Sequence, residues 1–168
     1  LDPADAVIHR GIVIVEGNRI AHVGPMPGPA VEPGDQIIDT SGCVVMPGLV
    51  NAHTHVSMTL LRGYADDMAL QEWLERKIWP AEMKLTPEDV YWGALLGIAE
   101  MIRGGVTTFN DMYHYPRAVA DAVQKSGIRG CISGVMLGML PTAEDLLRDA
   151  IELVSQMKVK AHPRLIPM

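Results

Sequence analysis

Residues 47–58 read PGLVNAHTHVSM, and this stretch decides the predicted fold. Its residues from Leu49 to His55 follow a Pro-Gly turn and form the first strand of the expected sheet. Residues two apart in a strand point to the same face, so His53 and His55 present two imidazoles side by side while Thr54 faces the other way. Because neutral imidazole binds zinc, iron, nickel or copper, the pair predicts a metal site.

Strand and helix signals alternate after this pair. Helices are expected over residues 69–79, where Pro80 should end the helix, over 87–103 and 116–126, and from Thr142 to about Met157. Strands are expected over 106–112, 128–137 and 165–168. This alternation is typical of parallel βαβ units, and catalytic groups in barrels of parallel strands lie at the C-terminal strand ends. The histidine pair ends the first such strand.

The residues before Pro47 have a different pattern. Residues 6–23 alternate β-branched and polar side chains around a Gly-Asn turn, which predicts an antiparallel hairpin. A Pro- and Gly-rich loop follows over 25–34, and two further short strands are expected at 36–39 and 42–46. We therefore expect a small β lobe over residues 1–46 and an α/β domain over residues 47–168.

Composition excludes several classes of partner. The net charge of -6 lacks the basic character that binding to a phosphate backbone requires. No apolar run reaches the roughly 20 residues needed to span a bilayer. The 2 cysteines are too few to indicate a disulfide-rich secreted protein. The sequence predicts a cytoplasmic protein with neither nucleic acid nor membrane as a partner.

Three stretches resemble a known family. The stretches that carry the resemblance are VVMPGLVNAHTHVSMTLLRGYADD at 44–67, EWLERKIWPAE at 72–82 and GGVTTFNDMY at 104–113. With them, the sequence resembles the amidohydrolase superfamily, and within it the deaminases of methylthioadenosine and S-adenosylhomocysteine and the related chlorohydrolases. The resemblance implies the N-terminal portion of a (β/α)8 TIM-type barrel, preceded by part of a small β-sandwich lobe. It also implies that His53 and His55 bind a divalent metal, zinc first and iron or nickel as alternatives, and that Glu82 binds the substrate.

The implied reaction is the hydrolytic deamination of an aminopurine nucleoside-type substrate by a metal-bound hydroxide. Alternatives are a triazine-type chlorohydrolase or aminohydrolase, a guanine deaminase and, in another class, a non-catalytic scaffold. A nucleotide-binding domain is disfavoured because neither GxGxxG nor GxxxxGK occurs. Family members add ligands and a proton-transferring Glu from later strands. No catalytic residue is therefore assigned here, and we expect the chain alone to be inactive, with a homo-oligomer left open.

Three further polar residues have competing interpretations. Asp111, near the end of the second barrel strand, could orient a metal-bound histidine or cap the helix that follows, and capping is favoured. His114 either reaches the mouth of the pocket or lies exposed in a loop. Arg62 is expected to form a salt bridge with Asp66 or Asp67 rather than to bind substrate.

Overall fold

The computed structural model describes residues 7–135, 143–159 and 162–168. Its contacts divide the chain into two compact units, Leu1–Pro47 and Gly48–Met168. No helix in the described part of the chain has the length and apolar character to cross a membrane. His53 and His55 both lie in the second unit.

The first unit contains the predicted hairpin. Strands β1 (Gly11–Glu16) and β2 (Arg19–Pro25) pair antiparallel, with Gly17 at φ 61° in the turn between them. The strands expected at 36–39 and 42–46 are absent, and this prediction is wrong: residues 35–40 and 44–48 have no regular structure. An extended segment becomes a strand only where another strand completes its hydrogen bonds, and none of the described residues pairs with these two segments.

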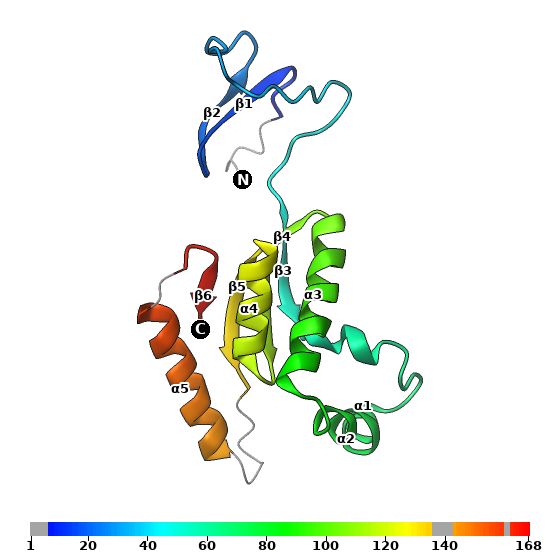
Figure 1. Ribbon diagram of the computed structural model, residues 1–168. Coiled ribbons are helices and arrows are strands. Elements are labelled where there is room, and N and C mark those ends of the chain that lie inside the picture. The colour runs from blue at the N-terminus through cyan, green and yellow to red at the C-terminus, as the bar shows by residue number, and fades with distance from the viewer. Residues whose placement is uncertain (1–6, 136–142, 160–161) are drawn as a thin grey trace. The chain divides into compact units, whose positions relative to one another are not determined.

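The second unit is built on a parallel sheet, as the alternation of signals predicts. Its 4 strands lie in the order β3-β4-β5-β6, and every neighbouring pair is parallel (Figure 1). The strands are β3 (Leu49–Thr54), β4 (Val106–Tyr113), β5 (Arg129–Gly134) and β6 (Leu165–Pro167). Thr142 and residues 136–137, which belong to predicted elements, lie outside the described residues.

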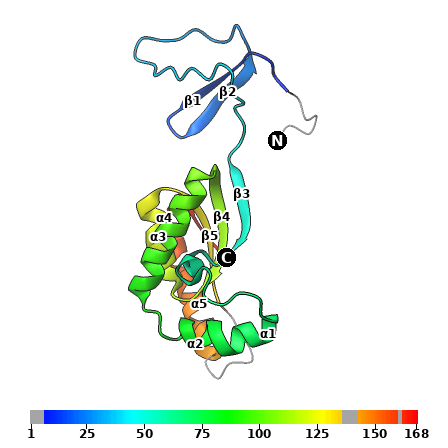
Figure 2. The ribbon, with the colours of Figure 1, turned by 90° about the vertical axis from the view of Figure 1, so that its right-hand side faces the viewer.

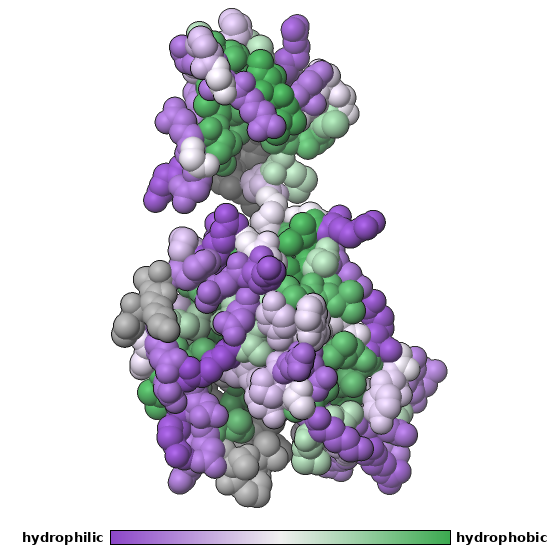
Figure 3. Space-filling view, in the orientation of Figure 1, coloured by the Kyte–Doolittle hydropathy of each residue, from purple (hydrophilic) through white to green (hydrophobic). Residues whose placement is uncertain are grey.

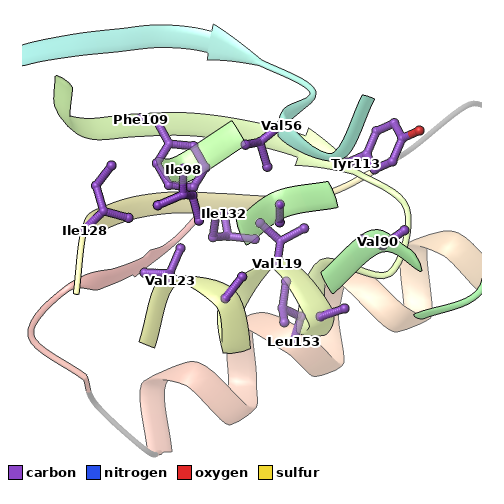
Figure 4. Close-up of a cluster of buried hydrophobic side chains, with 13 residues drawn as sticks. Val56, Val90, Ile98, Phe109, Tyr113, Val119, Val123, Ile128, Ile132 and Leu153 are labelled. Carbon is purple, nitrogen blue, oxygen red and sulfur yellow. The ribbon is translucent and has the colours of Figure 1, made fainter. Parts of the chain in front are cut away.

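Helices connect the strands and pack on the sheet. They are α3 (Pro87–Arg103), α4 (Pro116–Ser126) and α5 (Ala143–Val159), and Figure 2 shows α3 and α4 beside β3, β4 and β5. Between sheet and helices lies a core that includes Phe109, Ile132, Ile98 and Val119, all fully buried (Figure 4). The core fixes the position of β4, which lies beside the histidine-bearing strand.

Local signals set the ends of α3 and α4. Thr86 and Asp89 form a capping box at the start of α3, which has Pro87 as its first residue. Helix α4 ends at Gly127, whose φ of 77° is readily adopted only by glycine. Both helices have the predicted bounds.

The helical segment before α3 differs from the prediction. After the short helix η1 (Val56–Leu61), the chain forms α1 (Leu70–Trp73), the π-helical turn η2 (Leu74–Ile78) and α2 (Trp79–Glu82). Pro80 therefore does not end the helix. Pro80 lies in the first turn of α2, directly after the π-helical turn η2 and Trp79, and a proline is tolerated where the regular i→i−4 ladder is already interrupted. As a result, helical structure continues as far as Glu82.

Candidate metal centre

His53 and His55 lie at the C-terminal end of β3. Their ring centroids are 5.2 Å apart, with the ring planes at 75°. Thr54, between them, turns its hydroxyl toward Asp111 of β4. Strand alternation therefore brings the two imidazoles to one face of the sheet, next to the end of β4.

One nitrogen of the His55 ring has a fixed partner. Nδ1 lies 2.6 Å from the main-chain carbonyl oxygen of Met112. A carbonyl can only accept, so Nδ1 carries the proton and the lone pair of the neutral ring lies on Nε2. A backbone carbonyl in this role is a common way of orienting a metal-binding histidine.

Asp111 holds the turn that follows the histidines. Its Oδ1 accepts hydrogen bonds from the Val56 main-chain N–H at 2.7 Å and from the Thr54 hydroxyl at 3.3 Å. Burial raises the pKa of Asp111 to about 6, although the hydrogen bonds from Val56 and Thr54 and the nearby His55 act to lower it. Because Asp111 is only 1% exposed, these contacts form in a nearly dry environment.

The expectation that Asp111 caps the following helix is wrong. It caps η1, which precedes β4 in the chain, whereas α4 begins after Tyr115 without a side-chain cap. The reason is the register of the sheet: Asp111 pairs with Thr54, so its carboxylate meets the end of β3 and the first N–H of η1. It makes no hydrogen bond to a histidine ring, so its hydrogen bonds act on His55 through the neighbouring residues Thr54 and Val56.

Glu82 approaches this end of the sheet from α2. Its Oε2 lies 3.6 Å from Nε2 of His114, and the Glu82 and His114 side chains are 9% and 30% exposed. Burial raises the pKa of Tyr113, and the Glu82 carboxylate raises it further. His114 is thus neither a freely exposed loop residue nor isolated, because it pairs with the largely buried Glu82.

A row of aromatic rings connects the histidine pair with the Glu82–His114 pair. The centroids of His55 and Tyr113 are 6.2 Å apart, and those of Tyr113 and His114 are 5.4 Å apart. The histidine pair, Tyr113, His114 and Glu82 therefore form one continuous group, although Glu82 lies in α2 and the others lie at two strand ends.

Arg62 does not pair with Asp66 or Asp67. Its guanidinium makes two hydrogen bonds to the Glu100 carboxylate of α3, at 3.1 and 2.6 Å. Asp67 has a positive φ of 57° in the loop after η1, and Asp66, Asp67 and Trp73 line a shallow depression there. The expected salt bridge thus exists with a different partner, which ties η1 to α3.

The residues present suit part of a zinc-type site. Nε2 of His55 carries a free lone pair beside the His53 ring, and imidazole nitrogen is a preferred zinc ligand. Within the described ranges no group of 3 or more His, Cys, Asp or Glu side chains is arranged to hold a metal ion. The chain therefore supplies two candidate ligands, where a typical catalytic zinc has three from protein.

Sequence reasoning missed the parts of the site that depend on pairing between strands. The Met112 carbonyl, the Thr54–Asp111 hydrogen bond and Tyr113 were not predicted to contribute. The sequence does contain a pattern that indicates the role of Asp111. Phe109, Asp111 and Tyr113 occupy every second position of β4, so they share one face of the strand, and all three are buried. An acidic residue on a buried strand face indicates a specific partner.

The sequence of this chain is similar to those of known deaminases. The model of the amidohydrolase family matches residues 44–165. A 5-methylthioadenosine/S-adenosylhomocysteine deaminase of Syntrophomonas wolfei is 48% identical, over 96% of this chain and 37% of its own length. A 5'-deoxyadenosine deaminase of Methanosarcina mazei is 52% identical, over 79% of this chain and 30% of its own length. The chain thus spans about a third of the length of the curated relatives it matches.

A solved structure supports the fold. The adenosine deaminase of Xanthomonas campestris with bound zinc superposes with a TM-score of 0.75 at 31% identity, covering 96% of this chain and 38% of that one. The predicted fold class is confirmed: the parallel α/β unit is the first part of a TIM-type barrel, preceded by part of a small β lobe.

Proposed function

Because the chain belongs to the amidohydrolase family, we propose that it forms the N-terminal part of a metal-dependent hydrolase that deaminates an aminopurine nucleoside. The observation that carries the proposal is the pairing of His53 and His55 at the C-terminal end of β3, with the Nε2 lone pair of His55 available. The relatives named above act on adenosine-type compounds that differ at the 5' position, which supports an aminopurine as the reacting part.

His53 and His55 would hold a divalent metal, with zinc as the first choice and iron or nickel as alternatives. When bound, such a metal is a Lewis acid that makes water nucleophilic near neutral pH. The contribution of this chain is to orient the ligands: the Met112 carbonyl fixes the tautomer of His55, and the end of β3 sets the ring beside His53. The remaining ligands and the group that transfers the proton would belong to the part of the relatives that this chain does not cover.

Glu82 would bind the purine. Its carboxylate accepts hydrogen bonds from N–H groups, and a purine bearing an amino group offers such donors. The low exposure of Glu82 and its pairing with His114 limit the positions that its carboxylate can take. Held in this way, Glu82 would fix the orientation of the base relative to the metal, which is a large part of what an active site supplies.

The test uses the protein expressed from its complete reading frame. We expect about one equivalent of metal and ammonia release from methylthioadenosine, S-adenosylhomocysteine or 5'-deoxyadenosine, with both lost in His53→Ala. Glu82→Gln should keep its metal and lose roughly 100-fold or more in kcat/KM, because a charge-assisted hydrogen bond to the base is removed.

Other outcomes would point to other functions. Metal without ammonia release from these nucleosides, but with activity on a triazine or on guanine, would keep the hydrolase and change the substrate. A well-folded protein without metal would contradict the hydrolase proposal and favour a non-catalytic scaffold. A cytoplasmic location and a homo-oligomer remain predictions, which fractionation and light scattering would check.

A further inference from the structure

We propose that Asp111 is a positioning residue that holds the backbone on both sides of His55, and so sets the place of this ligand in the candidate metal centre. The inference rests on the proposed function, because it assigns a role within the same site. It concerns a residue that does not touch the metal or the substrate and acts only through the turn that carries His55.

The sheet ladder supports this turn only irregularly. The register of β4 with β5 is continuous from Thr108 to Tyr113, whereas the register of β3 with β4 shifts between Asn51 and Thr54. A ladder that is irregular at this point leaves the backbone around His53 without the even support of parallel pairing. After the register shift, main-chain pairing at the end of β3 is limited to Thr54 with Asp111, so side chains have to add to it.

Side chains and a carbonyl group of β4 hydrogen-bond to the end of β3 and to the turn after it. The Asn110 amide donates to the carbonyl oxygen of Ala52 at 3.1 Å, on the N-terminal side of the histidine pair. Asp111 Oδ1 bonds the residues on both sides of His55, the Thr54 hydroxyl and the Val56 N–H, and the Met112 carbonyl bonds the His55 ring itself. Four residues around the end of β3, Ala52, Thr54, His55 and Val56, are thereby tied to the consecutive β4 residues Asn110, Asp111 and Met112.

Asp111 itself is held firmly. Its main-chain carbonyl accepts from the Ser133 hydroxyl of β5 at 3.2 Å, and its strand pairs with β5 without interruption from Thr108 to Tyr113. The turn is therefore tied to the regular, core-packed part of the sheet. A movement of the His55 ring away from His53 would have to break contacts to this rigid strand.

The buried carboxylate of Asp111 does not increase the stability of the fold. Oδ2 is buried, and no described residue gives it a hydrogen bond. A buried carboxylate with an unpaired oxygen destabilises a fold relative to a neutral side chain. A positioning role accounts for a hydrogen-bond acceptor here, because the one Oδ1 atom accepts from two donors that flank the ligand.

The experiment measures zinc affinity by competition with a chelator, in the protein from its complete reading frame. Asp111→Ala should bind zinc 10- to 100-fold more weakly, the range typical when an outer partner of a metal ligand is removed. Asp111→Asn keeps an acceptor at Oδ1 and should stay within about 3-fold of the wild type, since side-chain amides accept equally from N–H and O–H donors. Phe109→Leu is the matched control: it changes a buried residue of the same strand and face, so it should lower the Tm and leave zinc affinity unchanged.

Each contrary result has a distinct meaning. Wild-type zinc affinity in folded Asp111→Ala would overturn the inference. An equal loss in Asp111→Asn would show that the charge matters rather than the hydrogen bonds, and would also overturn it. An equal loss in Phe109→Leu would reduce the effect to general stability. Absence of zinc binding in the wild type would contradict the proposed function, and the inference with it.

Discussion

The Asp111 carboxylate combines two opposed effects in one buried group. Its hydrogen bonds to Thr54 and Val56 favour the ionised form, yet burial outweighs them and raises the pKa to about 6. An unfolded chain would expose the same group with a pKa of about 3.9. Between these two values the folded state binds more protons than the unfolded state, so stability falls as the pH rises through this range.

Asp111→Asn should therefore remove a pH dependence of stability. At pH 4 and below, the variant and the wild type should unfold with similar free energies. At pH 7 the metal-free variant should be more stable by roughly 1–3 kcal/mol, because it no longer has to keep a buried carboxylate ionised. Urea unfolding at both pH values with a chelator present measures the difference, and a gap that does not change with pH would contradict the argument.

The residues of the site differ in how far the sequence could predict them. His53 and His55 are two apart in one strand, so a local rule was enough to place their rings side by side. The role of Asp111 depends on a partner 57 residues away, and that of His114 on a partner 32 residues away. Such pairings follow from strand register and from the path of α2, which local patterns do not encode.

Helix α3 and the short helix η1 approach each other closely because α3 has glycine at the contact. A Cβ built on Gly93 would lie 2.7 Å from the main-chain oxygen of Ser57. The Ser57 and Thr59 hydroxyls donate to the carbonyl oxygens of Val90 and Gly93, each at 2.8 Å. The start of η1, directly after His55, thus lies against α3 as well as against β4.

Gly93→Ala should destabilise the protein despite the better helix propensity of alanine. The added methyl group meets a backbone atom that cannot rotate away, and overpacking of this kind costs about 1–3 kcal/mol. In an exposed helical position the same change would stabilise by up to about 1 kcal/mol, and Ala99→Gly on the exposed part of α3 calibrates that effect. Chemical denaturation of the three proteins gives the comparison, and a more stable Gly93→Ala would refute the close contact.

Elements with strong local end signals were predicted well, and those that need a partner were not. The capping box of α3 and the glycine after α4 gave the correct bounds. The segments at 36–39 and 42–46 have strand-like composition but no pairing within the described residues, so they are not strands. Pro80 was expected to end a helix, but it lies in the first turn of α2, which follows the π-helical turn η2.

At the scale of the whole molecule, the second unit exposes surface that a closed barrel would cover. Within the described ranges β3 pairs only with β4, and Leu49 and Val50 of β3 are 51% and 66% exposed. Hydrophobic residues also gather over α3, where Leu96 and Ile102 are exposed (Figure 3). An unpaired strand with apolar side chains favours further pairing, which agrees with the chain covering 37% of its Syntrophomonas wolfei relative.

The 168-residue chain by itself should therefore bind zinc weakly and release no ammonia from adenosine-type substrates. Its described residues offer the pair His53 and His55 and no group of 3 or more ligands, while a catalytic zinc usually has three protein ligands. We expect its zinc affinity to be at least about 100-fold below that of the protein from the complete reading frame, since losing even an outer partner of a ligand costs 10- to 100-fold. Chelator competition with His53→Ala as the baseline measures this. Tight, stoichiometric zinc in the 168-residue chain would contradict this prediction.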